Sequence, residues 1–181
     1  MSKKVLVLTG SPRVGGNTEI LADAFVKGAQ AAGHEVMRFD AGRKEMKGCK
    51  ACNACYSNGS ACPFDEDFSE LAPMMEAADT IAFITPIYWF SFPTQIKAAI
   101  DKLYALLVGQ REINVKETLL IVCGEMDDTS VFEPVVSTYK TISGYMQWQD
   151  AGTLVVPAVL NEGDVRATDF PAKAEAMGRE L

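Results

Sequence analysis

Short, nearly continuous apolar runs alternate along this chain with longer stretches in which apolar residues recur at helical spacing. Residues 5–9 and 80–85 are typical of the short runs. Apolar runs of about four to eight residues indicate strands that are buried on both faces of a parallel sheet. The stretch that begins at Glu19 has apolar or small residues at positions 20, 21, 24, 25, 28, 29 and 32, as an amphipathic helix has. The pattern therefore predicts alternating strands and helices.

The rest of the chain continues this alternation and predicts five strands and five helices. We expect the strands at residues 5–9, 34–40, 80–85, 119–123 and 154–156. We expect the helices after Glu19, from Asp67 with Glu70 as its capping-box partner, from Pro93 to Leu107, from Ser130 with Glu133 as its partner, and after Thr168 or Asp169. Pro73 is expected to kink or restart the second helix. Such alternation predicts one doubly wound α/β domain over residues 1–181.

The first predicted strand runs into the segment 10–18, Gly-Ser-Pro-Arg-Val-Gly-Gly-Asn-Thr, which leads to the first helix. Free backbone N–H groups at a helix start, together with the positive end of the helix dipole, form a site for anions. Arg13 adds a planar guanidinium that suits phosphate oxygens. The segment lacks both the lysine of an NTPase loop and the glycine spacing of a dinucleotide fold, which favours a monophosphate. The candidate ligands are Ser11, Arg13, Gly16, Asn17 and Thr18, and a plain turn capped by Asn17 or Thr18 is the alternative.

The position of this segment favours a three-layer, flavodoxin-like α/β fold. In that fold a five-stranded parallel sheet of order 2-1-3-4-5 carries helices on both faces. Ligands of open α/β sheets bind beyond the carboxyl ends of the strands, at the point where the strand order reverses. We therefore expect the segments 10–18, 86–92 and 123–129 to meet there.

The second of these segments is rich in aromatic residues, which suit a flat heteroaromatic ring. The candidate ring-binding residues are Pro86, Ile87, Tyr88, Trp89, Phe90 and Gly124. Packing in the core or at a dimer interface is the alternative for the aromatic ones. It is favoured for Phe92 and, less strongly, for Phe90, whereas a ligand is favoured for Tyr88 and Trp89. Gly124 allows the backbone of the third segment to approach a ligand closely. A phosphate site beside a site for a flat polar ring indicates FMN.

Composition and charge exclude several classes of protein. With 181 residues, 48% of them hydrophobic and 23% charged, the chain has the composition of an ordinary soluble domain. A net charge of −7 disfavours nucleic acid as a partner. No run approaches the roughly 18 to 20 apolar residues that span a membrane, and the first strand leaves no room for a signal peptide, so we expect a cytoplasmic location. Basic residues nevertheless gather at Arg38, Arg43, Lys44, Lys47 and Lys50.

The sequence resembles the NADPH-dependent FMN reductase family over nearly its whole length. The residues that carry the resemblance are Gly10-Ser11-Pro12-Arg13 with Asn17-Thr18, and Thr85-Pro86-Ile87-Tyr88-Trp89 followed by Gln95-Ile96-Lys97 and Asp101-Lys102. The resemblance implies that FMN takes electrons from NAD(P)H or ferredoxin and passes them to a flavin, a quinone or another acceptor. No side-chain acid or base is required, because the flavin supplies the chemistry. We therefore name no catalytic residue.

A cysteine-rich insert occupies the long segment at about 41–64, which has no clear period. It contains Cys49, Cys52, Cys55 and Cys62, spaced C-x2-C-x2-C-x6-C and followed by proline. Disulfides are rare in a reducing cytosol, and structural zinc generally uses two separated pairs. The compact run is closer to the motif of bacterial ferredoxins, although their last gap is three residues. The insert resembles that of the iron–sulfur flavoprotein branch of the family, which implies one [4Fe-4S] cluster, complemented by the basic residues at 38–50. Zinc and unmetallated thiols remain open.

Two other functions stay open at this stage, and one expectation concerns assembly. The chain could be a non-catalytic electron carrier similar to flavodoxin, or a zinc-stabilised or thiol-sensing regulator. Exposed aromatic clusters mark interfaces, so we expect a homodimer or homotetramer with residues 88–92 and Trp148 near the subunit boundary.

Overall fold

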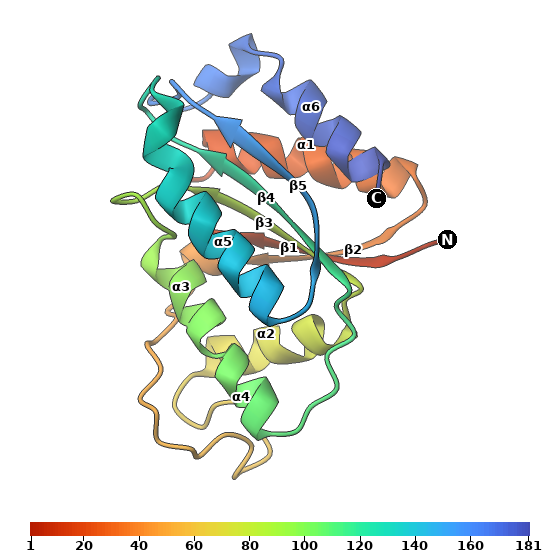
Figure 1. Cartoon of the computed structure of the whole chain (residues 1–181), viewed down its shortest axis with the longest axis vertical. Helices are drawn as coiled ribbons and strands as arrows, with labels where there is room; N and C mark the ends of the chain where they lie inside the picture. Colours follow the sequence, from red (N-terminus) through yellow and green to blue (C-terminus); the bar gives the residue numbers. More distant parts are fainter.

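A five-stranded parallel sheet forms the middle layer of the protein, in a computed structural model that describes residues 1–181 (Figure 1). The strands are β1 (Lys4–Thr9), β2 (Glu35–Asp40), β3 (Thr80–Pro86), β4 (Glu117–Cys123) and β5 (Gln149–Val156). Their order in the sheet is β2-β1-β3-β4-β5, and every neighbouring pair is parallel. The predicted fold class and strand order are therefore confirmed.

Helices cover both faces of the sheet. They are α1 (Asn17–Ala31), α2 (Glu66–Ala77), α3 (Thr94–Asp101), α4 (Leu103–Val108), α5 (Glu133–Tyr145) and α6 (Phe170–Arg179), with short 3-10 turns η1 (Ala41–Arg43), η2 (Thr129–Phe132) and η3 (Asp164–Ala167). Figure 1 shows α1 and α6 together on one side and α2 to α5 on the other. Alternate residues of β1 reach the two sides: Val5 and Val7 pack with α1 and α6, and Leu6 and Leu8 with the remaining helices. Strands buried in this way need apolar residues at every position, which explains the short continuous runs.

The helices α1 and α6 touch through glycines. A Cβ atom at Gly28 would lie 1.9 Å from the carbonyl oxygen of Glu175, and one at Gly178 would lie 2.2 Å from that of Phe25. Both distances are far below van der Waals contact, so no larger residue fits without moving a backbone. The closeness of these two helices sets the position of α6 against the sheet.

The start of α2 differs from the prediction. Asp65, not Asp67, precedes the helix, and its carboxylate accepts the N–H of Phe68 at 3.0 Å. Burial opposes ionisation of Asp65, but hydrogen bonds from Lys102, Phe68 and Lys47 hold its pKa below the ordinary value. Asp65 makes this cap because the fold also brings Lys102 to it, and a capping-box pattern cannot reveal that partner.

Two helix breaks also differ from the prediction. Residues Glu66–Ala77 form one helix through Pro73 instead of restarting there, since Leu71 and Met75 on either side are buried in the core. Conversely, the apolar stretch after Pro93 is divided into α3 and α4 at Lys102, whose side chain is buried.

Three smaller predictions need correction. The turn before α5 is capped by Asp128, which accepts the N–H of Ser130, so Ser130 and Glu133 form no capping box. The strand β5 begins at Gln149, five residues before its apolar part, because its polar start pairs with β4. Trp148 is buried in the core of its own chain, with 6% of its surface exposed, so it does not reach a subunit boundary.

No helix has both the length and the apolar character needed to cross a membrane.

Replacement of Gly28 by alanine is expected to destabilise the protein by about 1–3 kcal/mol, because the added methyl group overpacks the contact between α1 and α6. The matched control is Gly144→Ala in α5, where a Cβ meets nothing within 4 Å. That change should be neutral or stabilise by up to about 1 kcal/mol through helix propensity. Urea unfolding of both variants measures the difference, and equal stability of the two would contradict the close contact.

Candidate functional site

A cavity of about 680 Å³ opens at the carboxyl ends of β1, β3 and β4, where the strand order reverses. It is lined by Ser11, Arg13, Asn17, Thr18, Pro86, Ile87, Tyr88, Trp89, Phe90, Cys123, Gly124, Glu125, Met126, Val131, Val159 and Leu160. Every candidate phosphate- or ring-binding residue is among them except Gly16. The cavity has the size of a small-molecule site and the position expected for a ligand of an open α/β sheet.

One wall of the cavity is the start of α1. Gly16 precedes the first helical residue, and no side chain caps the helix. The backbone N–H groups of Gly16, Asn17 and Thr18 have no acceptor within the protein. The exposed guanidinium of Arg13 makes a single long hydrogen bond, 3.4 Å, to the carbonyl of Leu160. Unpaired amides at a helix start and a nearly free guanidinium are the donor set that a phosphate group needs.

The polar side chains of this loop hold its shape. Asn17 donates to the carbonyl of Asn161 at 2.8 Å and accepts the N–H of Val165 at 3.2 Å. The hydroxyl of Ser11 accepts the N–H of Arg13 at 3.2 Å. These bonds tie the loop to itself and to the segment that follows β5. The side-chain amide of Asn17 is therefore a support of the loop, and backbone groups are left to face the ligand.

A partly exposed charge network supports the loop from behind. Glu19 accepts the N–H of Gly15 and pairs with Arg43 at 2.9 Å. The same guanidinium donates to the carbonyl of Arg13 at 3.3 Å. The hydrogen bond from Gly15, followed by that from Arg43, lowers the pKa of Glu19. The carboxylate therefore stays ionised and holds both sides of the loop.

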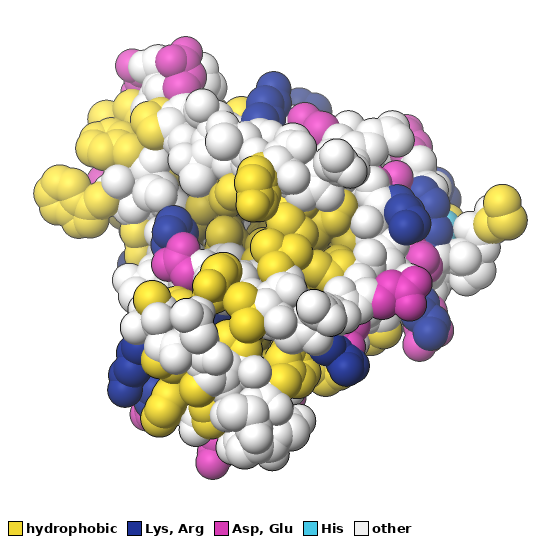
Figure 2. Space-filling view, turned by 60° about the horizontal axis from the view of Figure 1, so that its bottom comes forward, with side chains coloured by type: hydrophobic (Ala, Val, Ile, Leu, Met, Phe, Trp, Pro, Cys, Tyr) yellow, Lys and Arg dark blue, Asp and Glu magenta, His cyan; other side chains and the backbone are white.

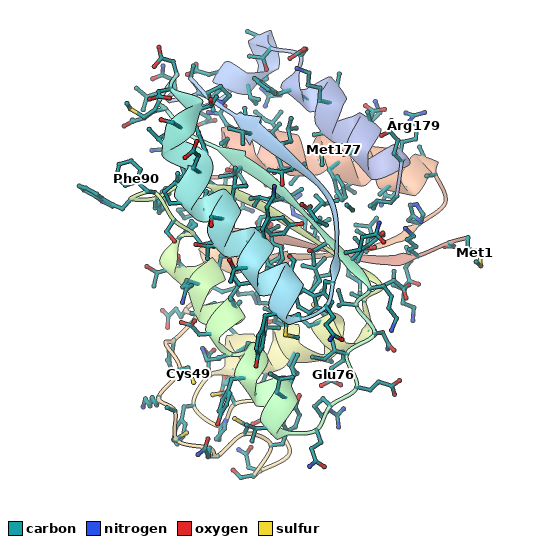
Figure 3. All side chains as sticks on the ribbon, viewed as in Figure 1. Met1, Cys49, Glu76, Phe90, Met177 and Arg179 are labelled. Carbon is teal, nitrogen blue, oxygen red and sulfur yellow. The ribbon has the colours of Figure 1, made fainter.

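The opposite wall is a tight aromatic hairpin after β3. Tyr88 and Ser91 exchange two backbone hydrogen bonds, of 3.0 and 3.1 Å, around Trp89 and Phe90. Those two residues have φ angles of 46° and 63°, a left-handed conformation that side chains rarely adopt. Trp89 is 93% exposed, and Figure 3 shows Phe90 projecting from the molecule. Strained residues of this kind collect at functional sites, which supports a binding role for the hairpin.

The floor of the cavity lies at the end of β4. A Cβ atom at Gly124 would come within 2.6 Å of the Cγ2 atom of Ile87, so glycine is required for this close packing. The Cys123 thiol lies 3.3 Å from the hydroxyl of Thr18, and burial raises its pKa to about 11. Cys123 is thus an inert part of the floor.

A third wall of the cavity was not among the predicted site residues. Val159 and Leu160 line the cavity from the segment after β5. The rule that ligands bind beyond the carboxyl ends of strands would have indicated this segment as well, because it follows the fifth predicted strand.

The cysteines lie in a separate region, the cysteine segment (residues 47–65), which forms the long loop at the bottom of Figure 1. Figure 3 places Cys49 there. In Figure 2 the molecule is turned so that this end comes forward, and hydrophobic side chains are gathered on the face in view. Cys49, Cys52, Cys55 and Cys62 all line one small cavity of about 30 Å³. Burial, with smaller contributions from the other three cysteines, raises the pKa of Cys55.

The structure holds no group of three or more His, Cys, Asp or Glu side chains close enough together to bind a metal ion. The four thiols nevertheless share one cavity, and thiolates are the ligands that select iron–sulfur clusters or zinc. The chemistry of the four thiols therefore suits such a group. In this conformation the thiols are not grouped closely enough to form a closed metal site.

The basic residues near the insert have other partners than expected. Arg38 pairs with Asp23 at 2.6 Å and with Asp40 at 2.8 Å, and Lys44 pairs with Glu70 at 2.6 Å. Arg43 pairs with Glu19 and contacts the segment 10–18, as described above. The expectation that the whole basic group complements the cysteines is therefore wrong, because carboxylates distant in the sequence neutralise most of it.

Comparison with known proteins identifies relatives of this architecture. The family model described as NADPH-dependent FMN reductase matches residues 3–149. An iron–sulfur flavoprotein of Methanosarcina thermophila is 35% identical over 99 residues, which cover 55% of this chain and 51% of that protein. YwqN of Bacillus subtilis, named as an NAD(P)H-dependent FMN-containing oxidoreductase, is 25% identical over 89% of this chain and 86% of its own. The chain thus spans about half the length of the iron–sulfur flavoproteins that it matches.

Solved structures share the fold. An NAD(P)H:quinone oxidoreductase from Methanothermobacter marburgensis superposes with a TM-score of 0.80 at 19% identity, over 100% of this chain and 96% of that one. An FMN-dependent NADH-azoreductase from Bacillus anthracis in complex with FMN gives a TM-score of 0.69 at 14% identity, over 98% and 99%. At these identities the likeness concerns the fold alone.

Proposed function

The chain belongs to the NADPH-dependent FMN reductase family, and from that premise we propose that it is an oxidoreductase that binds FMN in the cavity of about 680 Å³. Its electron donor would be NAD(P)H or ferredoxin, and its acceptor a flavin, a quinone or another small molecule or protein. When bound, FMN can take up two electrons and release them singly or together.

One observation carries this proposal. Unpaired N–H groups of Gly16, Asn17 and Thr18 and the guanidinium of Arg13 stand at one wall of the cavity, opposite aromatic side chains at the other. A phosphate and a flat ring joined by a short chain satisfy both walls at once. A ligand with only one of these parts would leave either the donors or the aromatic wall unused.

Each wall then has a distinct task. The amides and Arg13 would hold the phosphate and fix its position along the sheet edge. Pro86, Tyr88 and Trp89 would flank the ring and exclude water from one of its faces. The close packing of Gly124 against Ile87 would keep the floor flat beneath it.

Replacement of Arg13 by alanine is expected to weaken FMN binding by about 1.5–3 kcal/mol, through loss of a charge-assisted hydrogen bond. This corresponds to an increase in Kd of about tenfold to a hundredfold. Flavin fluorescence during titration of the apoprotein measures it. The control is Arg166→Ala, which removes the same charge from an exposed site outside the cavity. Equal Kd values for the two variants would contradict the phosphate assignment.

The alternative of a non-catalytic carrier similar to flavodoxin makes a different prediction. A reductase oxidises NAD(P)H rapidly and repeatedly when an acceptor such as a quinone is supplied, and a carrier does not. Steady-state NADH and NADPH oxidation by the FMN-loaded protein distinguishes the two functions.

We further propose that Cys49, Cys52, Cys55 and Cys62 bind one [4Fe-4S] cluster under anaerobic conditions. Support comes from the cavity that all four line and from their thiolate chemistry. The name of the Methanosarcina relative points the same way. A cluster would let electrons leave the flavin one at a time. The alternative of a zinc or thiol regulator uses the same ligands without redox activity.

Anaerobic reconstitution should give about four iron and four sulfide per chain. The Cys55→Ser variant should lose most of both, and the control Cys123→Ser, whose thiol lies in the flavin cavity, should retain them. Fewer than about one iron per chain with FMN still bound would leave a plain flavin reductase, and stoichiometric zinc would favour the regulator. A full cluster in Cys55→Ser would mean that the ligands are wrong.

We also propose a homodimer or homotetramer in which the exposed aromatic hairpin meets a second copy. Trp89, Phe90 and Tyr88 are 93%, 51% and 44% exposed and contiguous, a patch typical of interfaces. The double variant Trp89→Lys/Phe90→Lys is expected to shift the mass by light scattering toward the monomer. The control Tyr145→Lys changes an aromatic residue that is 78% exposed on α5 and should leave the mass unchanged. A monomeric wild type at micromolar concentration would refute this assembly.

A further inference from the structure

A buried ion pair lies beside the cysteine cavity. The ammonium of Lys102 is 2.6 Å from the carboxylate of Asp65, and their side chains are only 3% and 1% exposed. No other ion pair in the protein is comparably buried: each of the others has at least one side chain that is a quarter or more exposed. Burying two charges is costly unless they are paired and hydrogen-bonded, so a pair at this place calls for a specific reason.

The pair joins the two ends of the cysteine segment. Asp65, at the carboxyl end, accepts the N–H of Lys47 at 2.8 Å, and the Lys102 ammonium donates to the carbonyl of Lys47 at the amino end. Asp65 also caps α2 through the N–H of Phe68. The four cysteines thus lie in a loop whose ends are tied to each other and to the junction of α3 and α4.

The Lys102 side chain lies at the same cavity as the four cysteines. An ammonium has three N–H donors, and its acceptors in the protein are two, the carbonyl of Lys47 and the carboxylate of Asp65. The ammonium also lies over the ring of Phe68, 5.5 Å from the ring centroid, so its charge sits beside the cavity without a hydrogen bond to a thiol.

Other charges at this cavity are more weakly placed. Lys47 and Lys50 also line it but are exposed, and the Lys50 ammonium lies over the ring of Phe64. Water and salt screen exposed charges strongly and buried ones much less. The buried charge of Lys102 is therefore the cation best placed to act on whatever the thiolates hold.

We propose that Lys102 is a positioning and charge-compensating residue of the cysteine site, which closes the cysteine segment through Asp65 and stabilises the added negative charge of a reduced cluster. The charge-compensating part rests on the cluster in the proposed function, whereas the positioning part does not. A cluster becomes more negative when it gains an electron, so a nearby cation favours the reduced form. Removal of the Lys102 charge should therefore make the cluster harder to reduce.

Hydrogen exchange of the metal-free protein tests the positioning role. Three variants are compared with the wild type: Lys102→Met, the neutral pair Asp65→Asn/Lys102→Met, and the control Lys97→Met. The neutral pair keeps a side-chain cap for α2 and leaves no unpaired buried charge, so it guards against simple misfolding. Lys97 is an exposed lysine of α3, paired only with Asp101.

Amides of residues 47–65 are expected to exchange at least tenfold faster in both Lys102 variants, with the sheet and Lys97→Met unchanged. Exchange in this segment equal to that of the wild type, in a neutral pair that is folded, would overturn the positioning role.

A redox titration of the reconstituted holoprotein, followed by electron paramagnetic resonance, tests the charge. At a fixed ambient potential, Lys102→Met, which removes the lysine charge alone, is expected to hold a reduced-to-oxidised cluster ratio about tenfold below the wild type, equivalent to about 59 mV for one electron. The neutral pair also loses the opposite charge of Asp65, so its ratio should fall less. The FMN potential is the internal control, because Lys102 does not line the flavin cavity. An unchanged cluster potential would overturn the charge role. A wild type without iron and sulfide would overturn that role and the proposed cluster together, while hydrogen exchange still decides the positioning role.

Discussion

The architecture depends on the parallel pairing of β1 with two neighbours, β2 on one side and β3 on the other. Crossovers between parallel strands are right-handed, so the chain leaves β1 and β3 toward opposite faces of the sheet. The loops that follow these strands therefore diverge, and a crevice opens between them. This single constraint brings a helix start, an aromatic hairpin and the end of β4 together around one cavity, although the three segments are far apart in the sequence.

The cavity at the sheet edge and the cysteine segment are built on different physical principles. One wall of the cavity consists of backbone amides at the start of α1, and its side chains, such as Asn17, brace it from outside. Its shape follows from the sheet and from these hydrogen bonds. The cysteine segment has almost no secondary structure, and one buried ion pair closes it. A site of the first kind is preorganised by the fold, whereas one of the second kind is held by side-chain contacts, among which the buried ion pair joins the two ends of the segment.

Most of the fold, and the convergence of the candidate site residues on one cavity, could be predicted from the sequence, because their signals are local. A strand buried on both faces must be apolar throughout, which made β1, β3 and β4 visible as short runs. The segment 10–18 combines glycines, hydroxyls and Arg13 within nine consecutive residues, and its place after the first strand indicated the strand order. Tyr88 and Trp89 follow β3 directly, so their position at the sheet edge required no knowledge of distant contacts.

What only the tertiary structure decided concerns residues whose partners are far away in the sequence. The polar start of β5 at Gln149 is a strand because β4 lies beside it, and Trp148 is buried because the core reaches it. Arg38 and Lys44 are neutralised by carboxylates on other elements, and Lys102 is a buried cation only because Asp65 meets it across 37 residues. The energy of a charge depends on its distance from other charges and from water. The folded chain sets that distance. The sequence therefore determined the sheet and the edge at which the cavity opens, and the tertiary structure determined which charged side chains are paired and which are buried.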